Sequence, residues 1–91
     1  MEIEFDPAKD EINRGKRHVP LAFGVEVFSD AEMLIVPTIR IEDEEQRYKA
    51  IGLIDGRLWT VIYVMREYRY RFISVRKSNG TEQRLYSGIA R

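Results

Sequence analysis

The sequence predicts an α+β domain with a small antiparallel sheet of about four strands, two helices before the sheet and one after it. Residues 47–54, 57–65 and 69–77 predict the sheet, because each alternates in hydropathy or is rich in β-branched and aromatic residues. Asp55-Gly56 separates the first two of these segments and is a strong signal for a two-residue hairpin turn. The 91 residues suffice for one small domain, which we expect to span residues 1–91.

Before the sheet, residues 1–5 alternate apolar and acidic side chains and predict a short strand. Asp6-Pro7 then predicts the start of a helix, with Asp6 as N-cap and Pro7 in the first helical position. We expect this helix to run from Pro7 to about Arg14, with Ala8 and Ile12 facing inward and Gly15 ending it.

A second short helix is expected over residues 21–28, where apolar residues recur four positions apart, although residues 25–28 are also compatible with a strand. Residues 33–36 predict a short strand that Pro37 confines to a sheet edge or a strand end. Residues 40–46 are strongly acidic and predict a solvated loop. After the sheet, Asn79 and Glu82 form a variant capping box for a last helix, whose Leu85, Tyr86 and Ile89 are expected to face the sheet.

Composition excludes several classes of protein. The chain has no cysteine, which rules out a disulfide framework and a cysteine metal site, and no apolar run approaches the roughly 20 residues of a membrane span. The acidic N-terminus lacks the layout of a signal peptide, so we expect a cytoplasmic protein. A single histidine argues against a metal enzyme with imidazole ligands, whereas Mg²⁺ held by acids and water stays open.

The zero net charge conceals a strong asymmetry along the chain. Residues 1–45 hold twelve acidic and five basic residues, a net charge of −7, whereas residues 46–91 hold three acidic and ten basic residues, a net charge of +7. Such a distribution favours a basic surface that attracts phosphates, or an acidic partner.

The segment from Arg69 to Lys77 is the most informative part of the basic half. In a period-two reading, Tyr70, Phe72, Ser74 and Arg76 share one face, and Arg69, Arg71, Ile73 and Val75 share the other. Both faces thus mix core residues with cations, and guanidinium groups held on a strand are suited to bind phosphate. The structural alternative is an edge strand whose arginines are solvated and prevent pairing with other sheets.

Four motifs occur in order along nearly the whole chain and resemble the BrnT family of toxins from bacterial toxin–antitoxin modules. They are Phe5-Asp6-Pro7-x-Lys9-x-x-x-Asn13-x-x-Lys16, Glu45-x-Arg47-x-x-x-Ile51-Gly52, Arg71-x-Ile73-Ser74-x-Arg76 and Glu82-x-Arg84-x-Tyr86. The resemblance implies a RelE-like fold and RNA cleavage that needs no metal or other cofactor. It also implies neutralisation by a BrnA-type ribbon-helix-helix antitoxin in a heterotetramer, with DNA contacted only through that antitoxin.

The chain departs from the family pattern after Asn13. The family has Lys-His-Gly-Val, whereas this chain has Lys16-Arg17-His18-Val19. By ungapped spacing Arg17 takes the histidine position and His18 the glycine position, while a one-residue gap makes His18 the family histidine. The sequence leaves both alignments open.

Metal-free RNA cleavage requires a base for the 2′-OH, positive charge at the phosphorus and an acid for the 5′ oxygen. Arginines suit the second task, and His18 or Glu45 suits the proton transfers. Each candidate also has an ordinary structural role, such as a salt bridge for Arg47, a helix cap for His18, a solvated loop for Glu45, a hydrogen bond within the sheet for Ser74, or solubility for the lysines. The candidate catalytic residues are Glu45, Arg47, Arg71, Ser74, Arg76 and His18, and the candidate RNA-binding residues are Lys9, Lys16, Arg17 and Lys77.

Three functional hypotheses therefore stand side by side. The first is a toxin that cleaves RNA and inhibits translation. The second is a catalytically inactive module that binds a DNA-binding antitoxin partner. The third is a co-repressor that acts on DNA mainly through its partner.

Overall fold

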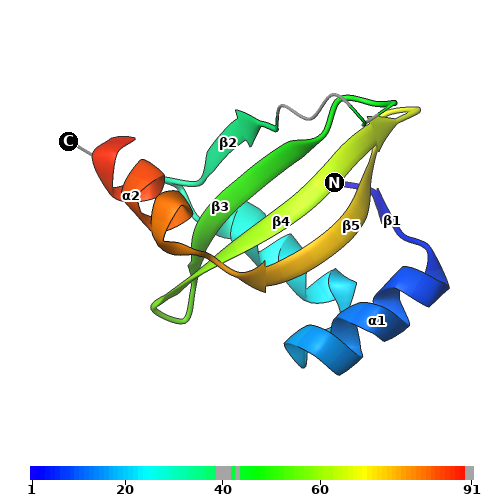
Figure 1. Ribbon diagram of the computed structural model, residues 1–91. Helices are drawn as coiled ribbons and strands as arrows, with labels where there is room; N and C mark the ends of the chain where they lie inside the picture. Colours follow the sequence, from blue (N-terminus) through cyan, green and yellow to red (C-terminus); the bar gives the residue numbers. More distant parts are fainter. Residues whose placement is uncertain (39–41, 43, 90–91) are drawn as a thin grey trace.

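The computed structural model describes residues 1–38, 42 and 44–89 and consists of a five-stranded mixed sheet with three helices (Figure 1). The strands lie in the order β1-β5-β4-β3-β2, and β1 is parallel to β5 while all other pairs are antiparallel. The α+β class is confirmed, but the expected sheet of about four antiparallel strands is wrong in strand number and in the direction of β1. The elements are β1 (Ile3–Glu4), α1 (Pro7–Arg17), η1 (Leu21–Ser29), β2 (Leu34–Pro37), β3 (Tyr48–Ile54), β4 (Arg57–Arg66), β5 (Arg69–Lys77) and α2 (Gly80–Ile89).

Helix α1 begins as expected and ends later than expected. The Asp6 carboxylate accepts a hydrogen bond from the Ala8 amide at 2.9 Å, and the next residue is the proline that starts the helix. Gly15 lies inside the helix, which continues to Arg17 and is capped by His18 in the left-handed conformation, with φ at 65°. The predicted end at Arg14 is therefore wrong.

The inward face of α1 was also predicted wrongly. Ala8 is exposed and Ile12 is 59% exposed, and Asn13 is the residue of α1 that the fold buries. The Asn13 amide donates to the backbone oxygens of Val19 and Val75 at 2.9 Å, and its oxygen accepts from the Val75 amide at 3.0 Å. A polar side chain thus joins α1 to β5, because it satisfies backbone groups of both neighbours.

The second helix, η1, is a 3₁₀ helix and covers one face of the sheet. Its buried residues, Leu21, Gly24 and Val27, recur every three positions, which is the period of a 3₁₀ helix and differs from the four-residue spacing that predicted an α-helix. Gly24 allows η1 to approach the sheet closely, because an added Cβ would lie 2.8 Å from methyl groups of both Val61 and Val75.

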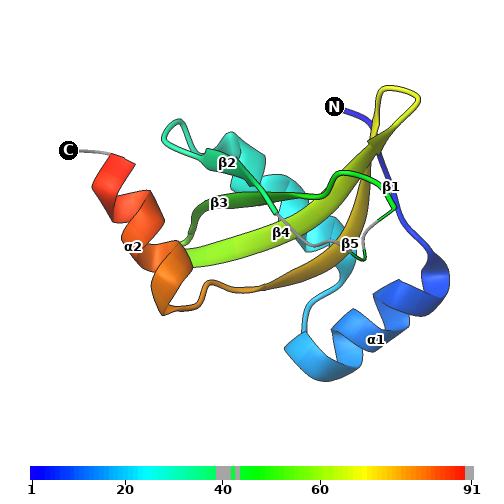
Figure 2. The ribbon, with the colours of Figure 1, turned by 45° about the horizontal axis from the view of Figure 1, so that its top comes forward.

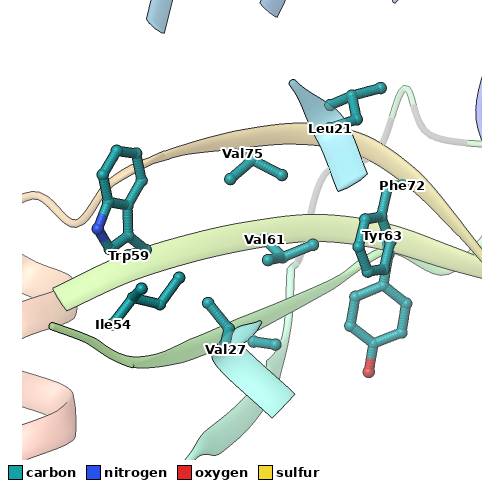
Figure 3. Packing of buried hydrophobic residues seen from close by; sticks show 9 residues of the cluster. Leu21, Val27, Ile54, Trp59, Val61, Tyr63, Phe72 and Val75 are labelled. Carbon is teal, nitrogen blue, oxygen red and sulfur yellow. The ribbon is translucent and has the colours of Figure 1, made fainter. Parts of the chain in front are cut away.

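The hydrophobic core lies between η1 and this face of the sheet (Figures 1 and 3). Trp59, Val61 and Tyr63 of β4 are buried there with Phe72 and Val75 of β5. Figure 3 shows Leu21 and Val27 of η1 over these strands. Burial of such apolar side chains is the main source of stability in a domain of this size.

A β-bulge in β5 changes the faces that the alternation predicted. Val61 of β4 pairs with Val75 of β5, and Tyr63 pairs with Phe72. The partners of the adjacent residues Ile62 and Tyr63 are therefore separated on β5 by one extra residue, Ile73. Phe72 and Val75 consequently both face the core, whereas the strict period of two placed them on opposite faces. The bulge moves Ser74 and Arg76 onto the same face as Arg71, the face that points away from η1.

The remaining elements largely follow the sequence signals. The Asp55-Gly56 turn joins β3 and β4, and both of its residues have positive φ, 49° and 79°. Strand β2 includes Pro37 and lies at the sheet edge, as expected. The predicted acidic loop falls partly on residues 39–41 and 43, which lie outside the described residues.

Helix α2 lies against the sheet near β3, on the other side of the molecule from α1 (Figures 1 and 2). Asn79 and Glu82 form the expected capping box, with reciprocal side chain to amide hydrogen bonds of 2.9 Å. Tyr86 donates a hydrogen bond of 2.7 Å to Asp30, whereas Leu85 is 43% exposed, and the side chain of Ile89 lies outside the described part.

Candidate functional site

The face of the sheet that points away from η1 carries three adjoining hollows. On β4 this face presents Thr60, Ile62 and Val64, whose partners on β5 are Arg76, Ser74 and Arg71. The three hollows share Ile73, the bulged residue, and therefore lie next to one another on this face. We name this surface the cationic groove and define it by Lys9, Arg47, Arg71, Ile73, Ser74 and Arg76.

One end of the cationic groove brings Arg47 and Arg71 together. Both line a hollow of about 310 Å³ with Lys9 from α1 and Arg66 from β4. The Arg71 guanidinium lies 3.5 Å from Glu4 on the neighbouring strand and remains partly exposed. Cations from four separate segments thus line one hollow, together with the carboxylates of Glu42, Glu44 and Glu45.

Glu45 lies in the same hollow and forms an ion pair with Arg66. Arg66 donates two hydrogen bonds to its carboxylate, from Nε at 3.1 Å and from Nη2 at 2.5 Å. These bonds, together with the charges of Arg66, Arg71 and Arg47, lower the pKa of the Glu45 carboxyl. The Glu45 carboxyl is consequently ionised at neutral pH.

The middle of the cationic groove lies between α1 and β5. Lys9, Lys16 and Arg17 line a hollow of about 270 Å³ with Ser74 and Ile73. Within the described residues, no carboxylate forms an ion pair with these three cations, and no side chain forms a hydrogen bond with the Ser74 hydroxyl. Such groups are ready to bind an anion without first breaking an internal contact.

The other end of the cationic groove is larger and more apolar. A hollow of about 680 Å³ lies between β2 and α2, over Ile62 and Ser74. Val36 and Leu85 supply apolar side chains on either side, and Arg47, Lys49 and Arg76 supply charge.

Arg76 differs from the other cations of the groove because a buried carboxylate holds it. Its two terminal nitrogens donate to the two oxygens of Glu82, each at 2.7 Å. Lys49 lies 2.9 Å from the same carboxylate, and the Thr60 hydroxyl donates to it at 3.0 Å. Burial alone would raise the pKa of Glu82, but the hydrogen bonds from Arg76, the Asn79 amide and Lys49 lower it to about 2.

Two of the candidate residues lie away from the groove. His18 is exposed at the C-terminal end of α1 and lines none of the three hollows, and Lys77 lines a separate hollow beside the β3–β4 turn. The left-handed φ of His18 is the conformation that favours glycine. This favours the ungapped alignment, in which His18 stands at the family glycine position and Arg17, which lines the groove, stands at the histidine position.

Sequence reasoning missed three groups that shape the site. Glu82 was identified as a helix cap and as part of a family motif, but its spacing from Arg76 along the chain gave no sign of an ion pair. Lys49 and Arg66 were not singled out, because their partners, Glu82 and Glu45, are more than twenty positions away along the chain. Only the folded arrangement reveals these pairs.

Two features of the described residues bear on other classes of function. None of the described helices is long and apolar enough to cross a membrane. In the same part of the chain, His, Cys, Asp and Glu side chains form no group of three or more that could hold a metal ion.

Comparison with known proteins assigns the family. No curated protein matches the chain significantly. The family model described as "Ribonuclease toxin, BrnT, of type II toxin-antitoxin system" matches residues 5–82, which begin just after β1, include α1, η1 and β2 to β5, and end in the first turn of α2. This match covers most of the chain and every residue that defines the cationic groove. The chain therefore belongs to the BrnT family of ribonuclease toxins from type II toxin–antitoxin systems.

Proposed function

We propose that the chain is a metal-independent endoribonuclease whose active site is the cationic groove and whose activity inhibits translation in the cytoplasm. The observation that carries this proposal is the convergence of Arg47, Arg71 and Lys9, from three separate segments, on one hollow. A phosphodiester in that hollow would meet planar guanidinium donors, which match the geometry of phosphate oxygens.

The proposed reaction uses the RNA's own 2′-OH as nucleophile. The 2′ oxygen bonds to the adjacent phosphorus, the bond from phosphorus to the 5′ oxygen breaks, and the products are a 2′,3′-cyclic phosphate and a 5′-OH. Arg47 and Arg71 stabilise the negative charge that develops on the phosphoryl oxygens. Because these cations are already in position in a partly enclosed site, they need little rearrangement while the negative charge develops.

The proton transfers are assigned to groups that line the same hollow. The ionised carboxylate of Glu45 accepts the 2′-OH proton, and the ammonium of Lys9 donates a proton to the 5′ oxygen. Ser74 binds a phosphate oxygen, and Lys16 and Arg17 hold the RNA backbone beside α1. Arg76 has a smaller role because Glu82 already neutralises it, and His18 has no part in this mechanism.

The experiment is cleavage of a single-stranded RNA by the purified chain, freed of antitoxin, in buffer with EDTA. We expect cleavage with 2′,3′-cyclic phosphate ends, and we expect Arg71→Ala to abolish it. Arg57→Ala is the matched control, because Arg57 is an exposed arginine beside the distant β3–β4 turn and should leave cleavage unchanged. Intact RNA from folded wild-type protein would contradict the proposal and favour the inactive binding module.

As a member of a type II system, the chain has a protein antitoxin as partner. We propose that this antitoxin is of the BrnA type, with a ribbon-helix-helix domain, and that the two form a heterotetramer that contacts DNA only through the antitoxin. The apolar end of the groove, with the 43% exposed Leu85, supports a protein partner there. Light scattering of the purified complex tests the stoichiometry, and a gel shift with the isolated chain and with the complex tests the origin of DNA binding.

A further inference from the structure

We propose that Tyr68, at the tip of the β4–β5 hairpin, is a stacking site for a nucleobase of the RNA whose phosphate occupies the cationic groove. This inference rests on the proposed function, because it extends the same site by one subsite. It adds a contact with a base to a site that otherwise offers contacts with phosphate.

The turn that carries Tyr68 has an unfavourable sequence for its backbone. Strand β4 ends at Arg66 and β5 begins at Arg69, so Glu67 and Tyr68 form a two-residue turn. Both have positive φ, 50° and 67°, and a two-residue turn of this kind strongly favours Asn-Gly or Asp-Gly. Tyrosine is a costly choice there, because its Cβ crowds the backbone in the left-handed region.

The other hairpin of the same sheet provides an internal comparison. The β3–β4 turn has the same length and the same signs of φ, and it contains the favourable pair Asp55-Gly56. The fold thus uses the favourable pair at one turn and Glu67-Tyr68 at the other. A backbone outlier of this kind points to a function for the residue that occupies it.

The Tyr68 ring contributes nothing to the packing of the described residues. It is 96% exposed, the largest exposed fraction among the exposed large hydrophobic side chains. It takes part in none of the aromatic contacts of the described part, which join Phe28, Tyr48, Tyr63, Tyr70 and Phe72, and Phe23 with Trp59. Figure 2 shows the β4–β5 hairpin extending beyond the rest of the sheet.

The position of Tyr68 relative to the cationic groove favours RNA as its ligand. Arg66 and Arg69, which flank the turn, are paired across the hairpin, and Arg66 lines the same hollow as Arg47 and Arg71. Tyr68 is three residues from Arg71, about 10 Å along the strand direction. Roughly one or two extended nucleotides bridge such a distance, so a strand with its phosphate at Arg71 brings a neighbouring base to the ring.

Stacking on a tyrosine tolerates any base, because every base has a π-face. Arg66 and Arg69 form exposed ion pairs with Glu45 and Glu2, so the cations of the groove, Arg71 among them, attract the backbone of the same strand. A protein partner would also use an exposed tyrosine, but the short separation along the chain between Tyr68 and Arg71, which lines the groove, favours a nucleic acid.

The test measures binding of a fluorescein-labelled, 2′-O-methylated single-stranded RNA, which the chain cannot cleave by attack of a 2′-OH. We expect Tyr68→Ala to weaken binding about tenfold and Tyr68→Trp to retain affinity within about twofold. The salt dependence of binding should keep its slope in Tyr68→Ala, because no phosphate contact is removed. Tyr68→Gly, which suits the positive φ, should show the same loss of affinity with no loss of stability.

A direct readout comes from RNA with 5-iodouracil at one position, which forms photocrosslinks with stacked aromatic side chains. We expect mass spectrometry to locate the crosslink at Tyr68. Unchanged RNA affinity in Tyr68→Ala, in an assay where Arg71→Ala weakens binding, would overturn this inference and leave the proposed function intact. Wild-type protein that does not bind the RNA would overturn both this inference and the proposed function. A Tyr68→Ala variant that loses affinity only for the antitoxin would assign the ring to a protein contact and overturn the RNA subsite.

Discussion

Arg76 and Glu82 form a bidentate ion pair with both N···O distances at 2.7 Å, and the Glu82 side chain is fully buried. Arg76 belongs to β5 and Glu82 to the first turn of α2, so the pair fastens α2 to the sheet. It also neutralises one cation of the groove. The same carboxylate therefore stabilises the fold and reduces the positive charge that Arg76 contributes to the groove.

The first prediction concerns the dependence of stability on pH. Burial raises the pKa of Glu82, but hydrogen bonds from Arg76, the Asn79 amide and Lys49 lower it to about 2, below its ordinary value of 4.5. A depressed pKa in the folded state stabilises the protein above pH 4.5, and this stabilisation disappears as the pH falls towards 2. We expect about 3 kcal/mol of unfolding free energy to be lost over this range. Urea unfolding at several pH values measures it.

The variant Glu82→Gln supplies the second prediction. Removing the charge leaves Arg76 and Lys49 without their carboxylate, and we expect a loss of about 2–4 kcal/mol together with a weaker acid transition. Glu45→Gln is the matched control, because it breaks an ion pair of similar geometry on an exposed surface and should therefore cost clearly less stability than Glu82→Gln. Equal losses in the two variants would show that burial of Glu82 does not determine its contribution.

The third prediction separates the two arginines of β5. Arg76→Ala should destabilise the fold by about 2–4 kcal/mol, because it leaves buried Glu82 with fewer partners. Arg71→Ala should change stability by under about 1 kcal/mol, because its partner Glu4 is 3.5 Å away and partly exposed. We expect the opposite order for RNA cleavage, with the larger loss of kcat/KM in Arg71→Ala. Unfolding and cleavage are measured on the same samples, and a larger catalytic loss in Arg76→Ala would contradict the neutralisation of Arg76.

Local signals in the sequence predicted much of the fold. The Asp55-Gly56 turn, the Asp6-Pro7 helix start and the Asn79–Glu82 capping box all appear, because each depends on a few adjacent residues. The parallel pairing of β1 with β5 was missed, because Ile3 meets Tyr70 across most of the chain. The three-residue period of η1 was hidden by apolar residues at almost every position.

The candidate site was likewise predictable where it depends on adjacent residues and not where it depends on residues distant in sequence. The basic segment 69–77 indicated phosphate binding, and Arg71 and Ser74 do line the cationic groove. The bulge at Ile73 could not be predicted, because it depends on the register with β4. Which cations are neutralised depends on carboxylates distant in sequence, as with Glu45 and Arg66.

The fourth prediction concerns His18. The left-handed φ of 65° at His18 costs conformational free energy that glycine avoids. We therefore expect His18→Gly to stabilise the protein by up to about 1 kcal/mol. The greater freedom of glycine in the unfolded chain reduces this gain. Because His18 lines none of the three hollows of the groove, cleavage should remain unchanged in this variant. Thermal unfolding and the RNA cleavage assay measure the two effects. Loss of cleavage in a stable His18→Gly protein would show that the imidazole takes part in the reaction.

The fifth prediction compares two glycines in helices. In Gly24→Ala the new methyl carbon would meet Val61 and Val75 at 2.8 Å, so η1 must move away from the sheet, and we expect a loss of about 1–3 kcal/mol. Gly15 lies inside α1 with no atom within 4 Å of an added Cβ, so Gly15→Ala should gain about 0.5–1 kcal/mol of helix propensity. Urea unfolding compares the two variants with wild type. Both changes add one methyl group to a glycine in a helix, so changes in unfolding free energy of opposite sign would show the effect of the close contact between η1 and the sheet. A Gly24→Ala protein as stable as wild type would mean that η1 can shift without disturbing the core.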